Sequence, residues 1–274
     1  MSLLSVSRLS KRFGGVKATD EVSLEVAAGE VHALLGPNGA GKTSLINQLS
    51  GSLLPDRGRI LFNGEDITRL PTHQRVGRGL VRSYQITRLF KSFSALDNLA
   101  LAVQARTGSS LSFWRQVRQE RALFDEAHAL LAEIGLSAQA QVRADRLAHG
   151  EQRALEVGLA LATRPSLLLL DEPLAGTGPE ESERMVTLIE RLRTTTTVLL
   201  VEHDVDAVFR LASRVTVLVN GRVIATGEPA AVRADPAVVA AYLGEEAAMS
   251  PPPGRPKAGS LPLGGKARSA QGAP

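Results

Sequence analysis

Residues 36–43, GPNGAGKT, combine glycines with a lysine and a threonine at a spacing suited to phosphate binding. They match the pattern G-x-x-x-x-G-K-[ST] at every fixed position, between an apolar strand and an apolar helix. Glycine lets the backbone close around an anion so that successive N–H groups point inward. Lys42 would contact the β- and γ-phosphates, and the Thr43 hydroxyl would be a ligand of Mg²⁺. The loop indicates a nucleoside triphosphate site but does not choose among kinases, GTPases and ATPases.

Acidic residues and a histidine follow two further apolar segments that read as strands. Asp171 and Glu172 come directly after SLLLL at 166–170, and an aspartate at such a strand end holds Mg²⁺ in proteins with this loop. Glu172 would accept a proton from the attacking water or orient it. His203 follows VLLVE at 198–202. Parallel α/β sheets collect their functional residues at the carboxyl ends of strands, so we interpret these three residues as parts of one site.

Alternating hydrophobic patterns predict the elements that position these residues. Helices alternate with strands after residue 150, with one helix ending near Thr163 and another at 180–192, which is typical of α/β architecture. Pairs of asparagine and glycine favour tight turns between strands. The expected strands are 3–9, 22–26, 30–35, 59–67, 166–171, 197–204 and 215–223, with turns at Asn63-Gly64 and Asn220-Gly221.

The middle of the chain predicts a helical insertion at about 88–160. Ser94 and Asp97 form a capping box ahead of an apolar helix. Apolar residues then recur at helical spacing as far as Gly135, and they are Trp114, Val117, Phe124, Ala127, Leu131 and Ile134.

Composition limits the class of protein and its location. The sequence is 43% hydrophobic and 22% charged, contains no cysteine, and begins with neither a secretory signal nor a membrane-spanning run, so we expect a cytoplasmic location. Residues 249–274 contain six prolines, five glycines and four basic residues without an acidic one, and we expect them to be disordered. The rest of the chain carries 28 basic and 28 acidic residues and lacks the basic footprint of a nucleic-acid-binding protein.

With these motifs in place, the chain resembles the ATP-binding subunit of an ABC transporter from about Leu4 to Leu243. GPNGAGKT is similar to the Walker A motif and LLLLDEP to the Walker B motif with its catalytic glutamate. LAHGEQ at 147–152 stands where the family has its LSGGQ signature, and RSYQ, VEHD and KRFGG stand at the Q-loop, the switch histidine and the adenine-stacking aromatic. The resemblance implies a P-loop NTPase (RecA-like) core with an antiparallel β subdomain and an inserted α-helical subdomain, all within residues 1–248.

The resemblance also implies roles for individual residues, with ATP and Mg²⁺ as cofactors. Catalytic roles fall on Glu172, His203, Gln85 and Lys42, and Mg²⁺ ligation on Thr43, Gln85 and Asp171. The nucleotide would be contacted by Phe13, Gly36, Pro37, Asn38, Gly39, Ala40, Gly41, Lys42, Thr43, Ser44, Gln85, Asp171 and His203.

The family signature implies that two such subunits dimerise head to tail, each offering its signature to the ATP of the other. In this chain the signature residues are Ala148, His149, Gly150 and Glu151. Ala148 replaces a serine whose hydroxyl would donate to the γ-phosphate, and Glu151 replaces a glutamine. Gly178 stands where the family commonly has an aspartate after the Walker B motif. We therefore expect a working but attenuated site, in which His149 is a candidate replacement donor.

The helical insertion, with VRSYQITRLFKSFSALDNL and AGTGPEE, is most similar to the ATPases of branched-chain and hydrophobic amino acid importers. This resemblance implies as partners two transmembrane permease subunits, a second ATPase subunit, and indirectly an extracytoplasmic solute-binding protein. A heterodimer of ATPases is favoured over a homodimer. The chain would lie peripherally on the cytoplasmic face of the inner membrane, and changes around Leu89 and Phe90 would uncouple transport while nucleotide binding persists.

Three alternatives stay open from sequence. A urea or amide importer ATPase would share the same pattern. A regulatory module that binds ATP with little hydrolysis would fit Ala148 and Gly178. Four intact residues argue against it, namely Lys42, Asp171, Glu172 and His203. A soluble ABC protein acting on ribosomes or DNA is disfavoured by the single phosphate loop and by the neutral charge, so no nucleic acid is expected as partner.

Overall fold

The computed structural model describes residues 2–83, 89–107 and 116–249. The strands are β1 (Ser2–Phe13), β2 (Val16–Ala27), β3 (Val31–Leu35), β4 (Arg57–Phe62), β5 (Glu65–Asp66), β6 (Leu80–Arg82), β7 (Leu167–Asp171), β8 (Thr197–Val201), β9 (Arg214–Val219) and β10 (Arg222–Gly227). The α-helices are α1 (Lys42–Ser50), α2 (Thr72–Gly77), α3 (Ala95–Thr107), α4 (Gln116–Glu133), α5 (His149–Leu161), α6 (Pro179–Leu192), α7 (Val205–Leu211), α8 (Pro229–Arg233) and α9 (Pro236–Met249).

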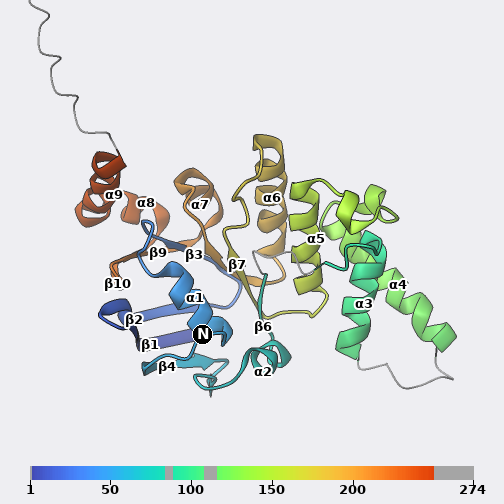
Figure 1. Cartoon of the computed structure of the whole chain (residues 1–274), viewed down its shortest axis with the longest axis horizontal. Coiled ribbons are helices and arrows are strands. Elements are labelled where there is room, and N and C mark those ends of the chain that lie inside the picture. The colour runs from blue at the N-terminus through green and yellow to red at the C-terminus, as the bar shows by residue number, and fades with distance from the viewer. Residues whose placement is uncertain (1, 84–88, 108–115, 250–274) are drawn as a thin grey trace, which may run out of the picture.

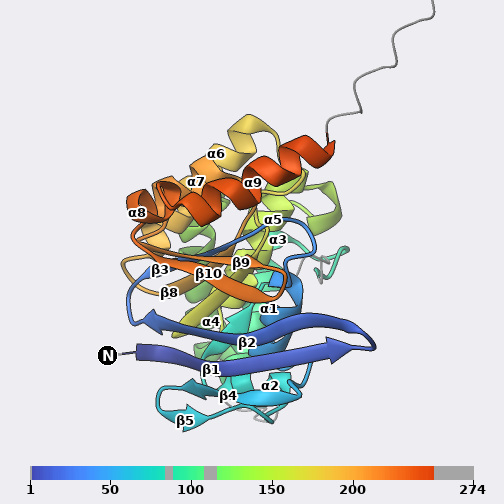
Figure 2. The ribbon, with the colours of Figure 1, turned by 90° about the vertical axis from the view of Figure 1, so that its left-hand side faces the viewer.

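These elements form two sheets with helices packed on them (Figure 1). The first sheet is antiparallel in the order β2-β1-β4-β5, and the second has the order β10-β9-β3-β8-β7-β6. Within the second sheet β9 and β10 are antiparallel, and the other neighbouring strands run parallel. Figure 2 shows the antiparallel sheet on one side of the parallel sheet and α6 to α9 on the other. The predicted α/β core with an antiparallel β subdomain is confirmed.

The hydrophobic pattern explains which face of each strand is buried. β7 and β8 are buried at every residue, as expected for central parallel strands that are covered on both faces. β2 instead alternates buried and exposed residues from Val22 to Ala27, and β1 contains both buried and exposed residues without strict alternation, since only one face of their sheet meets the core. Both run beyond their predicted ends because irregular register, with positive φ at Arg8 and Glu21, lets them bend. The Asn63-Gly64 turn between β4 and β5 is confirmed, with positive φ at both residues.

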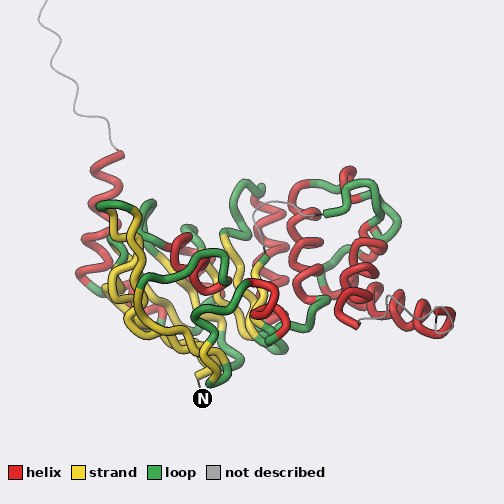
Figure 3. Tube along the Cα trace, turned by 60° about the horizontal axis from the view of Figure 1, so that its bottom comes forward, coloured by secondary structure: helices red, strands yellow, loops and turns green. Residues whose placement is uncertain are grey.

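Helices α3, α4 and α5 pack together as the predicted helical insertion between β6 and β7 (Figure 3). Half of the predicted capping box is present, since Ser94 Oγ accepts the backbone N–H of Asp97 at 3.0 Å. The Asp97 carboxylate accepts the Ser94 hydroxyl at 2.6 Å in place of the backbone N–H that a full box requires. The buried stripe of α4 is confirmed at Ala127 and Leu131. Phe124 departs from it with 39% of its surface exposed, because it lies on the outer side of the helix.

Several features fall outside the predicted elements. β6 and α2 are too short for a periodic pattern to show, and α8 and α9 follow the last predicted strand. Trp114 and the tail from residue 250 lie outside the described residues, as does the side chain of Val117. In the part of the chain that the structure describes, no helix has both the length and the apolar content to cross a lipid bilayer.

Arg75 is a buried cation that ties α2 to the end of α1. Its side chain is fully buried and donates to the carbonyls of Gln48 and Leu49 at 2.7 Å each, and to those of Leu70 and Thr68 at 2.9 and 3.0 Å. Burial lowers the pKa of Arg75 to about 10, so the guanidinium remains charged at neutral pH. Its positive charge lies at the C-terminal end of α1, the helix that follows the phosphate loop, and complements the negative end of that helix dipole.

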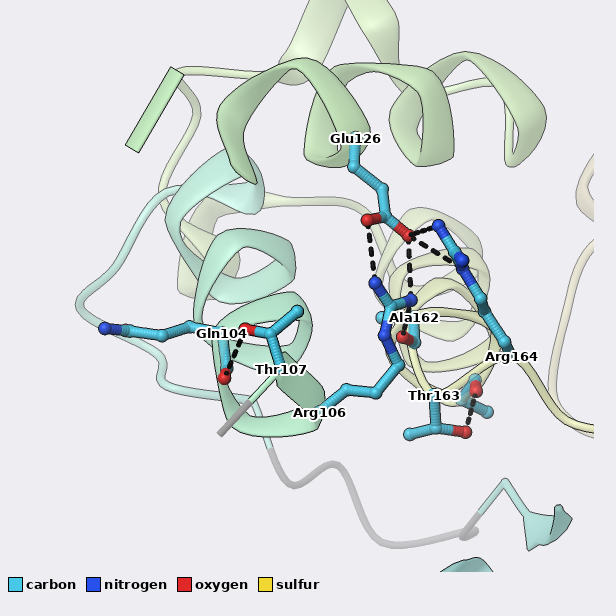
Figure 4. A network of polar contacts seen from close by, with 8 residues as sticks. Gln104, Arg106, Thr107, Glu126, Ala162, Thr163 and Arg164 are labelled. Atoms are coloured by element: carbon cyan, nitrogen blue, oxygen red, sulfur yellow. Dashed lines mark hydrogen bonds and ion pairs between the residues drawn. The ribbon is translucent and has the colours of Figure 1, made fainter. Parts of the chain in front are cut away.

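A polar cluster joins the C-terminal ends of α3 and α5 to the middle of α4 (Figure 4). Glu126 of α4 accepts two bonds of 2.8 Å from Arg106 at the end of α3, and Arg164 after α5 binds the same carboxylate at 3.1 Å. Arg106 also donates to the carbonyl of Ala162 at 2.9 Å. Paired bonds between a guanidinium and a carboxylate fix direction as well as distance. The cluster therefore holds α3, α4 and α5 as one unit.

We predict that Glu126→Gln destabilises the protein most at neutral pH. Bonds from Arg106, and more weakly from Arg164, lower the pKa of Glu126 below its usual value of 4.5. The ionised carboxylate thus stabilises the fold above that value, and the effect is lost as the pH falls through the lower folded pKa. Urea unfolding at pH 7 should give a free energy of unfolding about 1 kcal/mol lower for the variant than for wild type. The difference between the two proteins should become smaller towards pH 3.

Glu183→Gln is the matched control, because Glu183 also pairs with an arginine, Arg210, but both side chains are largely exposed. Its effect should stay under about 0.5 kcal/mol at any of these pH values. A gap for Glu126→Gln that is independent of pH would contradict the assignment.

Candidate functional site

The parallel pairing of β3, β8, β7 and β6 places their carboxyl ends at one edge of the sheet. The phosphate loop, residues 36–43, follows β3, and His203 comes two residues after β8. Asp171 is the last residue of β7, and Glu172 follows it. The structure thus brings to one edge the three segments that the sequence assigns to a nucleotide site.

The phosphate loop fits into a space that excludes side chains at two of its glycines. A Cβ at Gly36 would lie 2.1 Å from the carbonyl oxygen of Leu218, and one at Gly41 would lie 2.1 Å from that of Ala18. Both glycines also have positive φ. Lys42 is buried and donates to the carbonyls of Gly36 and of Pro37, the latter at 3.0 Å. The lysine is therefore held against the loop that it would complete.

Of the remaining loop residues, one is bonded to the sheet and others are exposed to solvent. Ala40 is buried, and its carbonyl accepts the N–H of Gly221 at 2.8 Å from the turn between β9 and β10. Asn38, Gly39 and Thr43 are exposed. A ligand can therefore reach the exposed side of a loop whose buried side is fixed to the sheet.

Asp171 is nearly inaccessible and is held by an arginine that the sequence analysis missed. Arg82 at the end of β6 donates to Oδ2 of Asp171 at 2.5 Å and to Oδ1 of Asn47 in α1 at 2.6 Å. A buried carboxylate needs such a partner, because transfer of an isolated charge from water is costly. Arg82 lies 89 residues from Asp171, so no local pattern pointed to the pair.

The donor set at this edge fits Mg²⁺. Thr43 offers a hydroxyl and Asp171 a carboxylate, both hard oxygen donors, and Mg²⁺ binds through one or two carboxylates together with water and substrate phosphates. Within residues 2–83, 89–107 and 116–249, no group of three or more histidines and acids could hold a metal without such phosphates. Thr43 and Asp171 would hold the ion. Gln85, the third predicted ligand, lies outside the described residues.

Glu172 has a backbone conformation that is rare for its residue type. Its φ is +49°, and its N–H donates to the carbonyl of Val201 at 2.8 Å, which extends the pairing of β7 with β8. A residue with a Cβ pays about 1–2 kcal/mol in this region, and such strain concentrates at functional sites. The side chain is partly exposed, so solvent or a ligand can reach the carboxylate.

His203 presents its ring to solvent, beside a buried glutamate. The side chain of His203 is 61% exposed, and its backbone N–H donates to Oε2 of Glu202 at 3.2 Å. Glu202 is fully buried, and burial raises its pKa, with the nearby charge of Glu172 acting in the same direction. Glu202 is a functional candidate that was not predicted, although a charged residue at the end of an otherwise apolar run is a usable signal in the sequence.

The signature residues form the exposed start of α5. Ala148 occupies the N-cap position but has no side-chain oxygen to cap the helix. Its N–H donates to Oε2 of Glu151 at 2.9 Å, and Oε1 of Glu151 accepts from Gln139 at 3.0 Å. Half of a capping box is therefore present, and the carboxylate that replaces the family glutamine is engaged within its own chain.

Two contacts connect this start of α5 to the segment after β7. A Cβ at Gly150 would lie 2.7 Å from Cδ of Glu181, so the glutamate of α6 packs directly against the glycine. A Cβ at Gly176 would lie 3.9 Å from Cε1 of His149. His149 thus lies over the loop between β7 and α6. Gly178, the N-cap of α6, has open space around it and no side chain with which to cap the helix.

Phe13, the predicted adenine contact, lies at the end of β1 with 52% of its surface exposed. Nζ of Lys11 lies 5.7 Å from the centre of its ring. An exposed aromatic face beside a cation can accept a flat base by stacking, and its role as the adenine contact stays a prediction.

Comparison with known proteins gives two family matches. The ABC transporter family matches residues 19–175, and a branched-chain amino acid ATP-binding cassette transporter family matches residues 222–248. The chain is 39% identical to the high-affinity branched-chain amino acid transport ATP-binding protein BraF of Pseudomonas aeruginosa and 40% identical to LivG of Escherichia coli, a protein described in the same words. Each alignment covers 89% of this chain and 98% of the relative.

Solved structures give a consistent result. The ADP conformation of MJ1267, an ATP-binding cassette of an ABC transporter, aligns with a TM-score of 0.77 at 31% identity. The alignment covers 89% of this chain and 99% of that one. A nucleotide-free ATP-binding cassette from an ABC transporter aligns with a TM-score of 0.75 at 30% identity. The fold is thus similar to that of ATP-binding cassettes of ABC transporters over most of the chain.

We predict that Glu172→Gly gives a more stable protein than Glu172→Ala, the reverse of the usual order. Alanine retains the Cβ that is unfavourable at a φ of +49°, whereas glycine does not. The difference in free energy of unfolding should be about 1 kcal/mol in favour of glycine. Chemical denaturation of the two variants would measure it. Greater stability for alanine would show that this backbone conformation is not maintained.

Proposed function

This chain belongs to the ABC transporter family, and we propose that it is the ATP-hydrolysing subunit of an importer for branched-chain or other hydrophobic amino acids. The names of the relatives and the match at residues 222–248 support this substrate class. A urea or amide importer is the second candidate, because the substrate is recognised by other subunits. The ATPase activity coupled to transport follows from the family itself.

The observation that carries the proposal is the joint placement of the phosphate loop, Asp171, Glu172 and His203 at one edge of the parallel sheet. A regulatory module with little hydrolysis would have no use for Glu172 in a strained conformation at that edge. Lys42, already buried against the loop, would bind the β- and γ-phosphates through its ammonium group.

In the proposed mechanism, different residues of this chain have different roles in ATP hydrolysis. The inward N–H groups of residues 36–43 and Lys42 bind the phosphates and oppose the charge that develops on them. Glu172 orients the attacking water and accepts its proton, and His203 contacts the γ-phosphate from the neighbouring loop. Mg²⁺, held by Thr43 and Asp171, would neutralise phosphate charge when it is bound.

We propose that the site is completed by a second ATPase subunit. The signature at the start of α5 would serve the ATP of that subunit, and the signature of that subunit would serve the ATP held here. Ala148 supplies no hydroxyl, and Glu151 adds a negative charge near that phosphate. The weakened signature favours pairing with a different ATPase chain over pairing with a copy.

We propose that the helical insertion contacts a membrane permease subunit on the cytoplasmic face, which makes the chain a peripheral membrane component. Phe90 and Phe93 are 59% and 43% exposed, and their rings stack at 5.6 Å. The side chain of Asn98 in α3 holds the backbone of Phe90. Its Oδ1 accepts the N–H of Phe90 at 2.9 Å, and its Nδ2 donates to the carbonyl of Phe90 at 3.1 Å. Leu89 is instead buried in the core, so Phe90 is the residue whose substitution tests coupling. The solute-binding protein acts through the permeases.

Steady-state ATP hydrolysis by the purified full chain, measured over a range of protein concentrations, tests the proposed function. We expect turnover per chain to rise with concentration, because two subunits must meet to close a site. Glu172→Gln should bind nucleotide but lose turnover by about 100-fold or more. Turnover that persists in Glu172→Gln would contradict the role of this carboxylate. Uptake of labelled leucine, set against labelled urea, by cells with and without the gene distinguishes the two substrate classes.

We predict that Ala148→Ser raises both the stability of α5 and the rate of hydrolysis. A serine at this N-cap can accept a backbone N–H of the first turn, worth about 0.5–1 kcal/mol, and can donate its hydroxyl to a phosphate. Thermal unfolding and turnover of the concentrated chain would measure the two effects. Stabilisation without faster turnover would mean that the missing hydroxyl does not limit this site.

A further inference from the structure

Glu202 occupies a buried position between two loops that carry proposed catalytic residues. It follows β8 directly, and its surface is 0% exposed. Its Oε1 accepts the backbone N–H of Leu174 at 2.8 Å, and its Oε2 accepts the backbone N–H of His203 at 3.2 Å. A single carboxylate therefore joins the loop after β7 to the loop after β8.

The geometry requires two acceptors in one small group. A carboxylate has two acceptor oxygens, whereas a glutamine amide has one oxygen and an NH₂ group that only donates. An apolar residue would leave both N–H groups without this acceptor in a buried setting. Glutamate is among the residue types that are rarely buried, so its place here calls for a specific use. The two N–H bonds supply one.

The same two loops are joined a second time through their backbones. Glu172 donates its N–H to the carbonyl of Val201, the last residue of β8, at 2.8 Å. Residues 172–174 are thus attached to the end of β8 at both of their ends, by Val201 at the first and by Glu202 at the last. The positions of Glu172 and of His203 then depend on one another through the Glu202 carboxylate.

We propose that Glu202 is a positioning residue for ATP hydrolysis, which sets Glu172 and His203 in register by binding both of their loops. The inference rests on the ATPase activity proposed above and adds to it a residue that need not touch the nucleotide. Lys42 donates to the carbonyls of Gly36 and Pro37 within the phosphate loop itself. Loss of Glu202 should therefore slow hydrolysis while the phosphate loop still binds ATP.

The experiment compares Glu202→Gln, Glu202→Ala and Leu199→Ala with the wild-type full chain. Leu199 is also fully buried on β8, and its truncation controls for a general loss of stability. We expect Glu202→Ala to lower kcat by about 10- to 100-fold, because small displacements of reacting groups are costly. KM for ATP should stay within about twofold, since ground-state binding is retained. Glu202→Gln keeps one acceptor and should give an intermediate kcat, whereas Leu199→Ala should lower the melting temperature without this selective loss.

Hydrogen exchange at the backbone amides supplies a readout that does not depend on turnover. In both Glu202 variants the amides of residues 172–178 and of His203 should exchange faster than in wild type, while those of residues 36–43 should not change. A wild-type kcat in Glu202→Ala, an equal loss of kcat in Leu199→Ala, or unchanged exchange at residues 172–178 would each overturn the inference. A wild-type chain without turnover would instead count against the proposed function, and the exchange data would still decide the role of Glu202.

Discussion

The phosphate loop can close only where two sheets meet. Gly36 passes against the carbonyl of Leu218 in β9, and Gly41 passes against that of Ala18 in β2, at distances that exclude a side chain. The loop is therefore packed against both the parallel and the antiparallel sheet, and each sheet excludes a side chain from one of its glycines. The turn between β9 and β10 completes the junction, because Gly221 donates to Ala40 and accepts from Asp20, both at 2.8 Å. The antiparallel sheet thus helps to shape the nucleotide site, because residues of β2 contact the phosphate loop and the turn beside it.

The charged groups buried at the edge of the parallel sheet are all stabilised in the same way, by hydrogen bonds to a nearby partner. Lys42, Asp171 and Glu202 are each removed from water, and each is satisfied by a partner from a different element. Lys42 binds loop carbonyls, Asp171 binds Arg82 of β6, and Glu202 binds two backbone N–H groups. Since an unpaired buried charge would cost several kcal/mol, loss of any one of these partners would disfavour the present arrangement of the neighbouring loops. The edge is ordered by polar bonds and the body of the sheet by apolar contacts.

Sequence reasoning reached the features that have a local cause. Four features were predictable because each follows from residues close together in the chain: the phosphate loop, the Ser94 N-cap, the Asn63-Gly64 turn and the apolar strands. Arg82 and Arg75 were not, because their partners are far away in sequence and a single arginine carries no period. Glu202 carried a signal in its apolar surroundings, but a single residue beside the more familiar His203 did not show which loop it would bind. Phe124 followed the helical period and still lies exposed, since spacing alone does not tell how wide the covered face of a helix is.

The start of α5 connects the two roles that one chain would have in a pair of ATPases. Gly150 packs on Glu181 of α6 and His149 lies over Gly176, so the signature rests on the segment that begins with Glu172. Glu202 anchors the first part of that segment at Leu174, and the cluster of Arg106, Glu126 and Arg164 holds α5 to α3 and α4. In the proposed pair of ATPases, a displacement of the inserted helices would therefore press on the loop that begins with Glu172 while it moved the start of α5. Any side chain at position 150 would force the side chain of Glu181 to move, so the glycine contributes to the packing of α5 on α6.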